Sequence, residues 1–451
     1  MSISKADNKF EKLILILSLI IFALTFIIYK YRLVPDSGSY IDMHPMREPL
    51  YPFFLFIFRF IFNLFNAGDD AYFYAVSVAQ NLLAAYALYF AVINLRRLFN
   101  LNNLISSLIF LVFLAPSFFT IILSRTGVVM SCSIGTEALT VPLYYIYFTL
   151  LIKFILEHDI KYYIKAVLIS VLLALTRGQM LMLFIINFFA FIAVNKKFFK
   201  ALLIMLACFA LTALITRSYF YIVHGQFIGN RYGAVAALPA VLLSVNESDA
   251  DLFEDKDLKE LYIKIMREID LNGYKAHYKL SNSELFKRSG TAEFVYDAIR
   301  IHAGAVIYEY ATANKGVSGL NAEIERDKIA SSITKTIMKS HGFIKNFINI
   351  YFSWVIIGCI NSVAMLHPIL DIYAALIYVI ALSLLLICVI KKLKREALFM
   401  IFALLALIGF VTSVALVVTP ISRYVIYGFT FFYSALLVCL GALLKINNKM
   451  L

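Results

Sequence analysis

Long apolar runs alternate with short polar segments along most of the chain. Runs of about 17–25 apolar residues match the length of helix that crosses a bilayer. We place ten such spans at 11–30, 71–95, 103–122, 138–156, 162–176, 179–195, 199–222, 369–390, 397–418 and 423–445. The pattern therefore predicts an all-α, polytopic membrane protein.

Two further apolar segments, 50–66 and 343–366, do not fit this alternation. Arg59 interrupts the first, and Lys345, Asn346 and Asn349 make the start of the second polar. We expect both to form helices that lie in or near the outer interface of the membrane. The alternative is that one of them crosses and that one cluster of basic residues then lies on the opposite side.

Composition agrees with a membrane protein. Hydrophobic residues make up 62% of the 451 residues and charged residues 15%, whereas soluble proteins are usually about 45–50% apolar. The five cysteines are scattered without the spacing of a zinc site or of a disulfide framework.

The net charge of +13 belongs to the membrane segments. Segment 225–343 holds 15 basic and 16 acidic residues, so the remaining chain holds 26 basic and 12 acidic residues. Positive charge in the short loops is typical of the cytoplasmic side. We therefore expect a multi-pass protein of the plasma membrane with both termini in the cytoplasm and 225–343 outside, and no nucleic-acid partner.

This arrangement predicts three parts. Residues 1–224 form a membrane module whose first outer loop is 31–50, residues 225–343 an extracytoplasmic domain, and residues 344–451 an interfacial helix followed by the last spans. Within Asp251–Ile269, apolar residues recur at helical spacing among charges, and 292–339 is also helix-like. The outer domain is therefore expected to be helical.

Candidate chemistry gathers in the first outer loop, in Pro35-Asp36-Ser37-Gly38-Ser39-Tyr40 and in Arg47-Glu48-Pro49-Leu50-Tyr51-Pro52. Asp36 and Arg47 are thus expected where a membrane helix meets water. Charged residues at such places are costly and usually functional.

These two stretches resemble the first outer loop of the GT-C glycosyltransferases, a family that includes protein O-mannosyltransferases and lipid A aminoarabinose transferases. Thr136-Glu137-Ala138-Leu139 and Ser422-Arg423-Tyr424 match that family in position. The resemblance implies transfer of a sugar from a polyprenyl-phosphate donor to a glycan, lipid or protein acceptor. It places Asp36 as the catalytic base and Arg47 at the donor phosphate, with Tyr40 and Tyr51 of the same motifs at the substrate.

Other charged residues at expected outer turns extend this candidate site. Glu137 is a second candidate catalytic residue, and Arg125, Arg177 and Arg423 are candidate ligands for phosphate. Each has an ordinary structural alternative as well. Asp36 suits a turn, and Glu48 suits a salt bridge with Arg47. Glu137 suits the first turn of a helix capped by Thr136, and the arginines suit interfacial anchoring.

No cofactor is expected with certainty. A divalent metal is conceivable near Asp42-Met43-His44, but the loop has no Asp-x-Asp and the other histidines are dispersed. Two rival functions stay open. A polysaccharide polymerase or O-antigen ligase would rely on cations of the 225–343 loop, and a flippase or transporter would carry ionisable residues within its spans.

Overall fold

The computed structural model describes residues 5–123, 129–230, 233–276, 278, 288–364, 371–420 and 422–450. The described chain is almost entirely helical and separates into two compact units. Unit 1 comprises residues 1–229, 378–407 and 427–451, and unit 2 comprises residues 230–377 and 408–426. Residues 378–407 and 427–451 thus belong to unit 1, whereas residues 344–377 and 408–426 belong to unit 2.

Unit 1 contains the N-terminal helices and the last helix. Its elements are α1 (Lys5–Tyr29), β1 (Arg32–Leu33), α2 (Ser37–Ile41), α3 (Leu50–Leu64), α4 (Asp69–Phe99), α5 (Asn103–Leu123), η1 (Met130–Cys132), β2 (Ser133–Ile134), α6 (Glu137–Glu157), α7 (Ile160–Ala174), η2 (Gly178–Leu181), α8 (Met182–Asn195), α9 (Phe198–His224) and α19 (Tyr427–Met450). Parts of α16 (Asp371–Ile390) and α17 (Lys394–Ala415) also belong to it.

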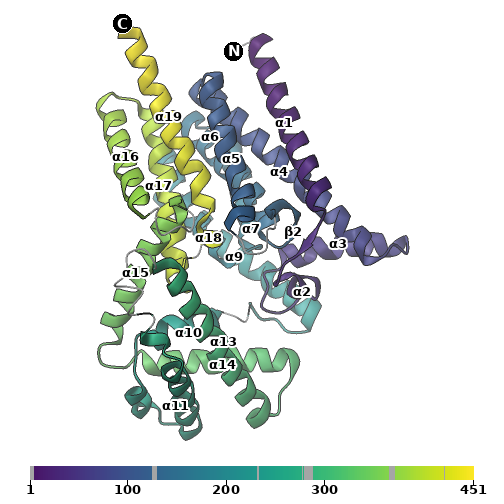
Figure 1. Cartoon of the computed structure of the whole chain (residues 1–451), viewed down its shortest axis with the longest axis vertical. Helices are drawn as coiled ribbons and strands as arrows, with labels where there is room; N and C mark the ends of the chain where they lie inside the picture. Colours follow the sequence, from purple (N-terminus) through teal and green to yellow (C-terminus); the bar gives the residue numbers. More distant parts are fainter. Residues whose placement is uncertain are drawn as a thin grey trace. The chain divides into compact units, whose positions relative to one another are not determined.

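The long helices of unit 1 form a bundle around α4 and α6. Helix α4 contacts α1, α5 and α6, α6 contacts α7, and α5 contacts α19; Figure 1 shows these helices side by side. Several helices end where a residue adopts the left-handed conformation, as at Asn100, His158 and Lys196. That conformation stops a helix and allows the next one to fold back.

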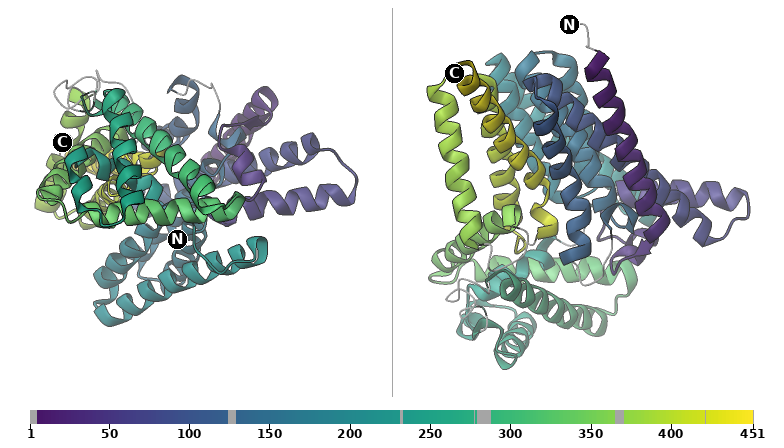
Figure 2. Two further views of the ribbon diagram at one scale, coloured as in Figure 1. Left: turned by 90° about the horizontal axis from the view of Figure 1, so that it is seen from below. Right: turned by 45° about the horizontal axis from the view of Figure 1, so that its top comes forward.

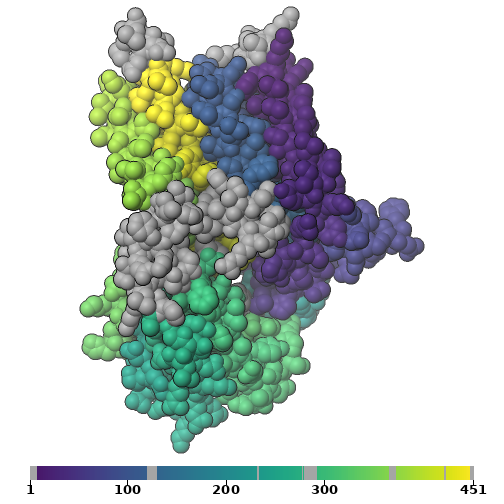
Figure 3. Space-filling view, viewed as in Figure 1, coloured from purple at the N-terminus to yellow at the C-terminus, as the bar shows by residue number. Residues whose placement is uncertain are grey.

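Helix α3 turns back against α4, and the two form an arm that projects from the bundle in both views of Figure 2. Helix α1 lies on the face of unit 1 drawn in Figure 3, where it is purple along its length. Large apolar side chains of α1 such as Ile16, Ile20 and Leu24 are exposed. An exposed apolar helix of 25 residues is what a lipid environment accommodates.

Basic residues expected on one side of the membrane lie together at one end of unit 1. The Arg97 Nε donates to Glu11 Oε1 at 2.8 Å, and Lys153 Nζ donates to Asn94 Oδ1 at 3.0 Å. Lys445 donates to the carbonyl of Asn100. These contacts join the start of α1, the end of α4, the end of α6 and the end of α19.

Unit 2 is a helical unit with its own hydrophobic core. Its elements are α10 (Gly233–Leu243), η3 (Glu247–Leu252), α11 (Lys256–Leu271), α13 (Arg288–Lys315), α14 (Gly319–Ile337), α15 (Phe343–Ala364) and α18 (Ser422–Val425). Tyr262 of α11, Ile299 of α13, Ile333 of α14 and Trp354 of α15 are among its core residues. Asp255 caps α11 by accepting from Asp257 N and Leu258 N, so the helix expected from Asp251 begins at Lys256.

Nine helices within the described residues are long and apolar enough to cross a membrane. They begin and end at Asn8–Tyr29, Asp69–Phe99, Glu137–Glu157, Gly178–Asn195, Phe198–His224, Phe343–Ala364, Ile372–Ile390, Lys394–Ala415 and Tyr427–Ile446. The chain is therefore a multi-pass α-helical membrane protein.

This set differs from the expected spans in two places, at α7 and at α15. Helix α7, expected to cross at 162–176, has only 15 residues; at 1.5 Å per residue it reaches about 22 Å, less than the ~30 Å of a hydrocarbon core. Helix α5 (Asn103–Leu123) covers the expected span 103–122, and its side chains are described as far as Phe118. The segment 343–366 was expected in the interface, whereas α15 meets the criteria for a span.

Candidate functional site

A pair of short parallel strands connects the first outer loop to the start of α6. Arg32 pairs with Ser133 and Leu33 with Ile134. The Ser37 Oγ donates to the carbonyl of Ile134 at 2.7 Å and accepts from the backbone N–H of Val34 at the same distance. Residues separated by about a hundred positions in the chain are thus held together, at the end of unit 1 opposite to the Arg97–Glu11 pair.

Asp36 and Arg47, the two candidate residues of the first outer loop, form an ion pair with each other. The Arg47 NH2 donates to Asp36 Oδ1 at 2.7 Å, with the two side chains 23% and 35% exposed. The Arg47 Nε donates to Ser39 Oγ at 2.7 Å, and NH1 donates to the Tyr40 hydroxyl at 3.3 Å. Because the guanidinium carbon also lies 4.5 Å from the centre of the Tyr40 ring, Arg47 is held in one orientation.

A second ion pair lies close to the first one in the same unit. The Arg177 NH1 donates to Glu137 Oε1 at 2.6 Å, and these side chains are only 13% and 18% exposed. Arg177 NH1 also lies 3.3 Å from the Tyr427 hydroxyl at the start of α19. The turns before α6 and η2 therefore meet the last helix of the chain.

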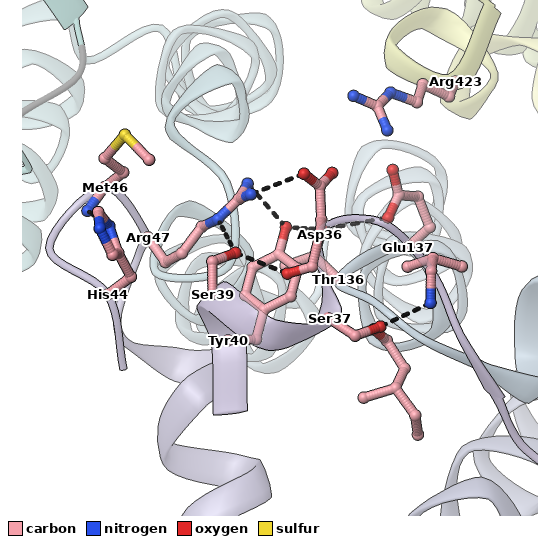
Figure 4. Close-up of polar contacts among 12 residues, drawn as sticks. Asp36, Ser37, Ser39, Tyr40, His44, Met46, Arg47, Thr136, Glu137 and Arg423 are labelled. Carbon is pink, nitrogen blue, oxygen red and sulfur yellow. Dashed lines mark hydrogen bonds and ion pairs between the residues drawn. The ribbon is translucent and has the colours of Figure 1, made fainter. Parts of the chain in front are cut away.

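Tyr40 and Thr136 lie between Arg47 and Glu137 (Figure 4). They therefore connect the Asp36–Arg47 pair to the Glu137–Arg177 pair. The Thr136 Oγ1 donates to Glu137 Oε2 at 3.2 Å and lies 3.4 Å from the Tyr40 hydroxyl. Since the single hydroxyl proton of Thr136 is donated to Glu137, the Tyr40 hydroxyl donates to Thr136. Burial, with the nearby Glu137 charge, raises the pKa of the Tyr40 phenol, which therefore stays protonated and able to donate.

Two buried side chains, Tyr51 and Gln80, support the site from the interior of unit 1. Tyr51, fully buried, stacks edge-on against Tyr40 with ring centres 5.2 Å apart. With its amide oxygen toward the Tyr51 hydroxyl at 2.8 Å, Gln80 donates to the carbonyls of Ser131 and Ser133 at 3.2 Å. The loop that carries Arg47 and the segment that leads to Glu137 are thereby fastened to the same residue of α4.

The observed contacts can be compared with the structural roles that the sequence suggested for Asp36, Glu48 and Glu137. Asp36 precedes α2 but makes no capping hydrogen bond, and the ion pair of Arg47 is to Asp36 rather than to Glu48. The carboxylate of Glu48 instead approaches Gly178. Thr136 precedes α6, as expected, but its side chain does not cap the helix. Glu137 lies in the first helical turn and is ion-paired with Arg177.

The remaining predicted residues differ in burial and in the unit that holds them. Tyr40 is 6% exposed and Tyr51 0%, so they support the loop from the interior rather than facing outward. Arg423 belongs to unit 2, where its NH2 lies 3.0 Å from the Tyr424 hydroxyl. Arg125 lies outside the described residues.

Metal binding finds no geometric support among the residues that the structure describes. No group of three or more His, Cys, Asp or Glu side chains gathers there. His44 Nδ1 lies 3.3 Å from the backbone N–H of Met46 in the loop beside Asp42.

Three participants were not anticipated from the sequence as parts of the site. Ser39 holds the Arg47 guanidinium, Gln80 joins the two loops from within α4, and Tyr427 contacts Arg177. A glutamine beside an asparagine in the middle of an apolar helix is a signal for Gln80, because a polar side chain there needs buried partners. No local signal distinguishes Tyr427 among the 28 tyrosines.

The fold and the cluster define a class of protein: an all-α multi-pass membrane protein with two acid–arginine pairs at one end of its main helical bundle. Comparison with protein-family models, with curated proteins and with solved structures finds no match for this chain.

Proposed function

We propose that this protein is a membrane glycosyltransferase of the GT-C type, which moves a sugar from a polyprenyl-phosphate donor to an acceptor on the outer face of the plasma membrane. The observation that supports this most directly is the Asp36–Arg47 pair just beyond the end of α1. A carboxylate and a guanidinium at the rim of an apolar bundle suit a donor whose phosphate is charged and whose tail stays in the bilayer.

The proposed reaction is a direct displacement. The Asp36 carboxylate accepts the proton of an acceptor hydroxyl, whose oxygen attacks the anomeric carbon of the donor sugar. The bond from that carbon to the phosphate oxygen breaks, and the polyprenyl phosphate leaves with the electron pair. Arg47 stabilises the charge on the departing phosphate, and the anomeric configuration inverts.

The contacts of Arg47 indicate how the donor phosphate would enter. Ser39 and Tyr40 are neutral partners that hold Nε and NH1, whereas NH2 is held by the carboxylate of Asp36. A phosphate that replaces Asp36 on NH2 would gain a charge-assisted hydrogen bond and leave the other two contacts in place. The same exchange would release the Asp36 carboxylate for the acceptor hydroxyl.

The decisive variant is Asp36→Asn, because asparagine keeps the acceptor oxygen of Asp36 and loses the ionisable carboxylate. We expect it to fold and to bind the donor but to transfer labelled sugar from a polyprenyl phosphate about 10²–10⁴-fold more slowly. Asp36→Glu should retain part of the activity. The assay uses the purified full chain in nanodiscs, with thermal stability measured on the same sample.

The matched control is Asp70→Asn, which changes a second carboxylate, held by the Tyr31 hydroxyl where α4 begins. It should transfer at the normal rate. Near-normal transfer by Asp36→Asn would remove Asp36 as the base. The search would then move to Glu137 or to a ligase-like site within 225–343.

A further inference from the structure

The two ion pairs belong to one directed chain of hydrogen bonds. Arg47 donates to Tyr40, Tyr40 to Thr136, and Thr136 to Glu137, which also accepts from Arg177. The link between Tyr40 and Thr136 is the longest of these at 3.4 Å. Each hydroxyl both accepts and donates, so the strength of one bond depends on its neighbours.

Burial protects this chain from competition with water. Tyr40 is 6% exposed and Thr136 2%. Hydrogen bonds in such surroundings are stronger than in water, and a buried hydroxyl that loses its partner is costly. Loss of a hydrogen bond at Tyr40 or Thr136 is therefore expected to weaken the contacts of both Arg47 and Glu137.

We propose that Tyr40 is a positioning residue that couples the Asp36–Arg47 pair to the Glu137–Arg177 pair, so that an anion bound at Arg47 changes the hydrogen bonding of Glu137. The identity of that anion as a lipid-linked phosphate rests on the proposed function. The coupling itself rests on the contacts of Arg47, Tyr40 and Thr136. By reciprocity, a change at Thr136 alters the affinity for an anion at Arg47.

Two conservative substitutions interrupt this series of hydrogen bonds without changing any charge. Tyr40→Phe removes the phenol hydroxyl but keeps the ring that packs on Tyr51, and Thr136→Val removes the Thr136 hydroxyl. Their matched controls lie farther along α6. Tyr147→Phe removes a buried hydroxyl bonded to Asn187, and Thr149→Val removes one bonded to the carbonyl of Tyr145.

The first measurement is the dissociation constant of farnesyl phosphate for the full-length protein. We expect Thr136→Val to weaken binding by about 5-fold, although Thr136 has no contact with Arg47. In the Tyr40→Phe background the same change should have an effect below about 2-fold, because the link is already broken. If Tyr40 had only a structural role, Thr136→Val would change the dissociation constant by the same factor with Tyr40 present and in the Tyr40→Phe background. The two α6 controls should bind normally.

The second measurement needs no ligand. Apparent midpoints of thermal unfolding are compared for Arg47→Ala, Thr136→Val and the double variant. We expect non-additive shifts with Tyr40 present and additive shifts in Tyr40→Phe.

The two measurements separate the coupling from the proposed function. Non-additive midpoints in a protein that does not bind farnesyl phosphate would support the coupling and contradict the donor proposed above. Binding that depends on Arg47 but not on Thr136, together with additive midpoints, would overturn the coupling and leave the proposed donor intact.

Discussion

Arg47 has three hydrogen-bond partners, which hold its guanidinium in the orientation that the proposed binding of a phosphate requires. Two of the partners, Ser39 and Tyr40, are neutral, and only Asp36 is charged. Arginine presents its donors in a planar fork, so fixing two of them also fixes the direction of the third. A lysine at this position would supply charge without that orientation.

At the scale of this residue, Arg47→Ala should weaken use of the donor much more than use of the acceptor. A hydrogen bond to a charged group contributes about 1.5–3 kcal/mol, and that contribution would be lost. Arg47→Lys should restore part of it, because a point charge still attracts phosphate. The measurement is the rate of sugar transfer as a function of donor and of acceptor concentration.

The control for this prediction is Arg97→Ala, which breaks the ion pair with Glu11 at the opposite end of unit 1. It should leave the dependence on donor unchanged. If Arg47→Ala also left it unchanged, Arg47 would be a structural salt bridge rather than a phosphate ligand.

Among the elements, α15 packs closely in unit 2 at Gly358, where an added side chain would press on its neighbours. A Cβ added at Gly358 would lie 2.7 Å from Val411 Cγ1 and 2.8 Å from Pro420 Cβ. Three residues later, Asn361 Nδ2 donates to the carbonyl of Pro420 at 2.9 Å. At Gly358 the helix therefore packs directly against the side chains of Val411 and Pro420, and Asn361 fixes the turn by its hydrogen bond.

We expect Gly358→Ala to destabilise the protein by about 1–3 kcal/mol, because the added methyl group overpacks a filled site. The measurement is thermal unfolding in detergent. Gly304→Ala is the matched control, since this glycine lies within α13 of the same unit and its added Cβ would meet Val235 at an ordinary 3.5 Å. The control should be neutral or stabilising by about 0.5–1 kcal/mol, the usual advantage of alanine in a helix. Equal stability of the two variants would contradict the close packing at Pro420.

For the whole molecule, the position of α15 decides the topology. Helix α15 has the length and composition of a span, and its side chains Ile348, Phe352 and Ile356 are exposed. The basic cluster 391–395 is nevertheless expected in the cytoplasm, which favours a single crossing, α16, between 225–343 and this cluster. Since α17 and α19 follow, the number of crossings up to the C-terminus is then odd. Three crossings after α15 satisfy this rule, whereas a fourth through α15 would place the C-terminus outside.

Cysteine labelling of intact cells tests this topology at both ends of the disputed region. With Asn282→Cys and Asn448→Cys made separately, an impermeant reagent should label position 282 and not position 448. The native cysteines Cys132, Cys208, Cys388 and Cys439 are buried and Cys359 is half-buried, so the unsubstituted protein serves as the background control. Labelling of position 448 would show that α15 crosses the membrane and that the charge rule fails here.

Much of this organisation follows from local properties of the sequence. Apolar runs predict helices because a backbone in lipid must satisfy its own hydrogen bonds. The spacing of Leu261, Ile265 and Ile269 predicts α11, because residues four apart share one face of a helix. In the structure that face is buried, and its burial stabilises the helix. Asp36 and Arg47 are singled out by their place in the two motifs of the first outer loop, and their role stays a prediction.

The tertiary structure decided which polar groups become partners. Glu137 and Arg177 are 40 positions apart, and Arg177 and Tyr427 are 250 apart. No local pattern joins such residues, because the packing of α6, α7 and α19 brings them together. Local pattern also left open whether Asp36 was a turn residue and whether Arg47 paired with Glu48. Those choices depend on the distances between side chains, which are set only when the helices pack and the polar groups between them find partners.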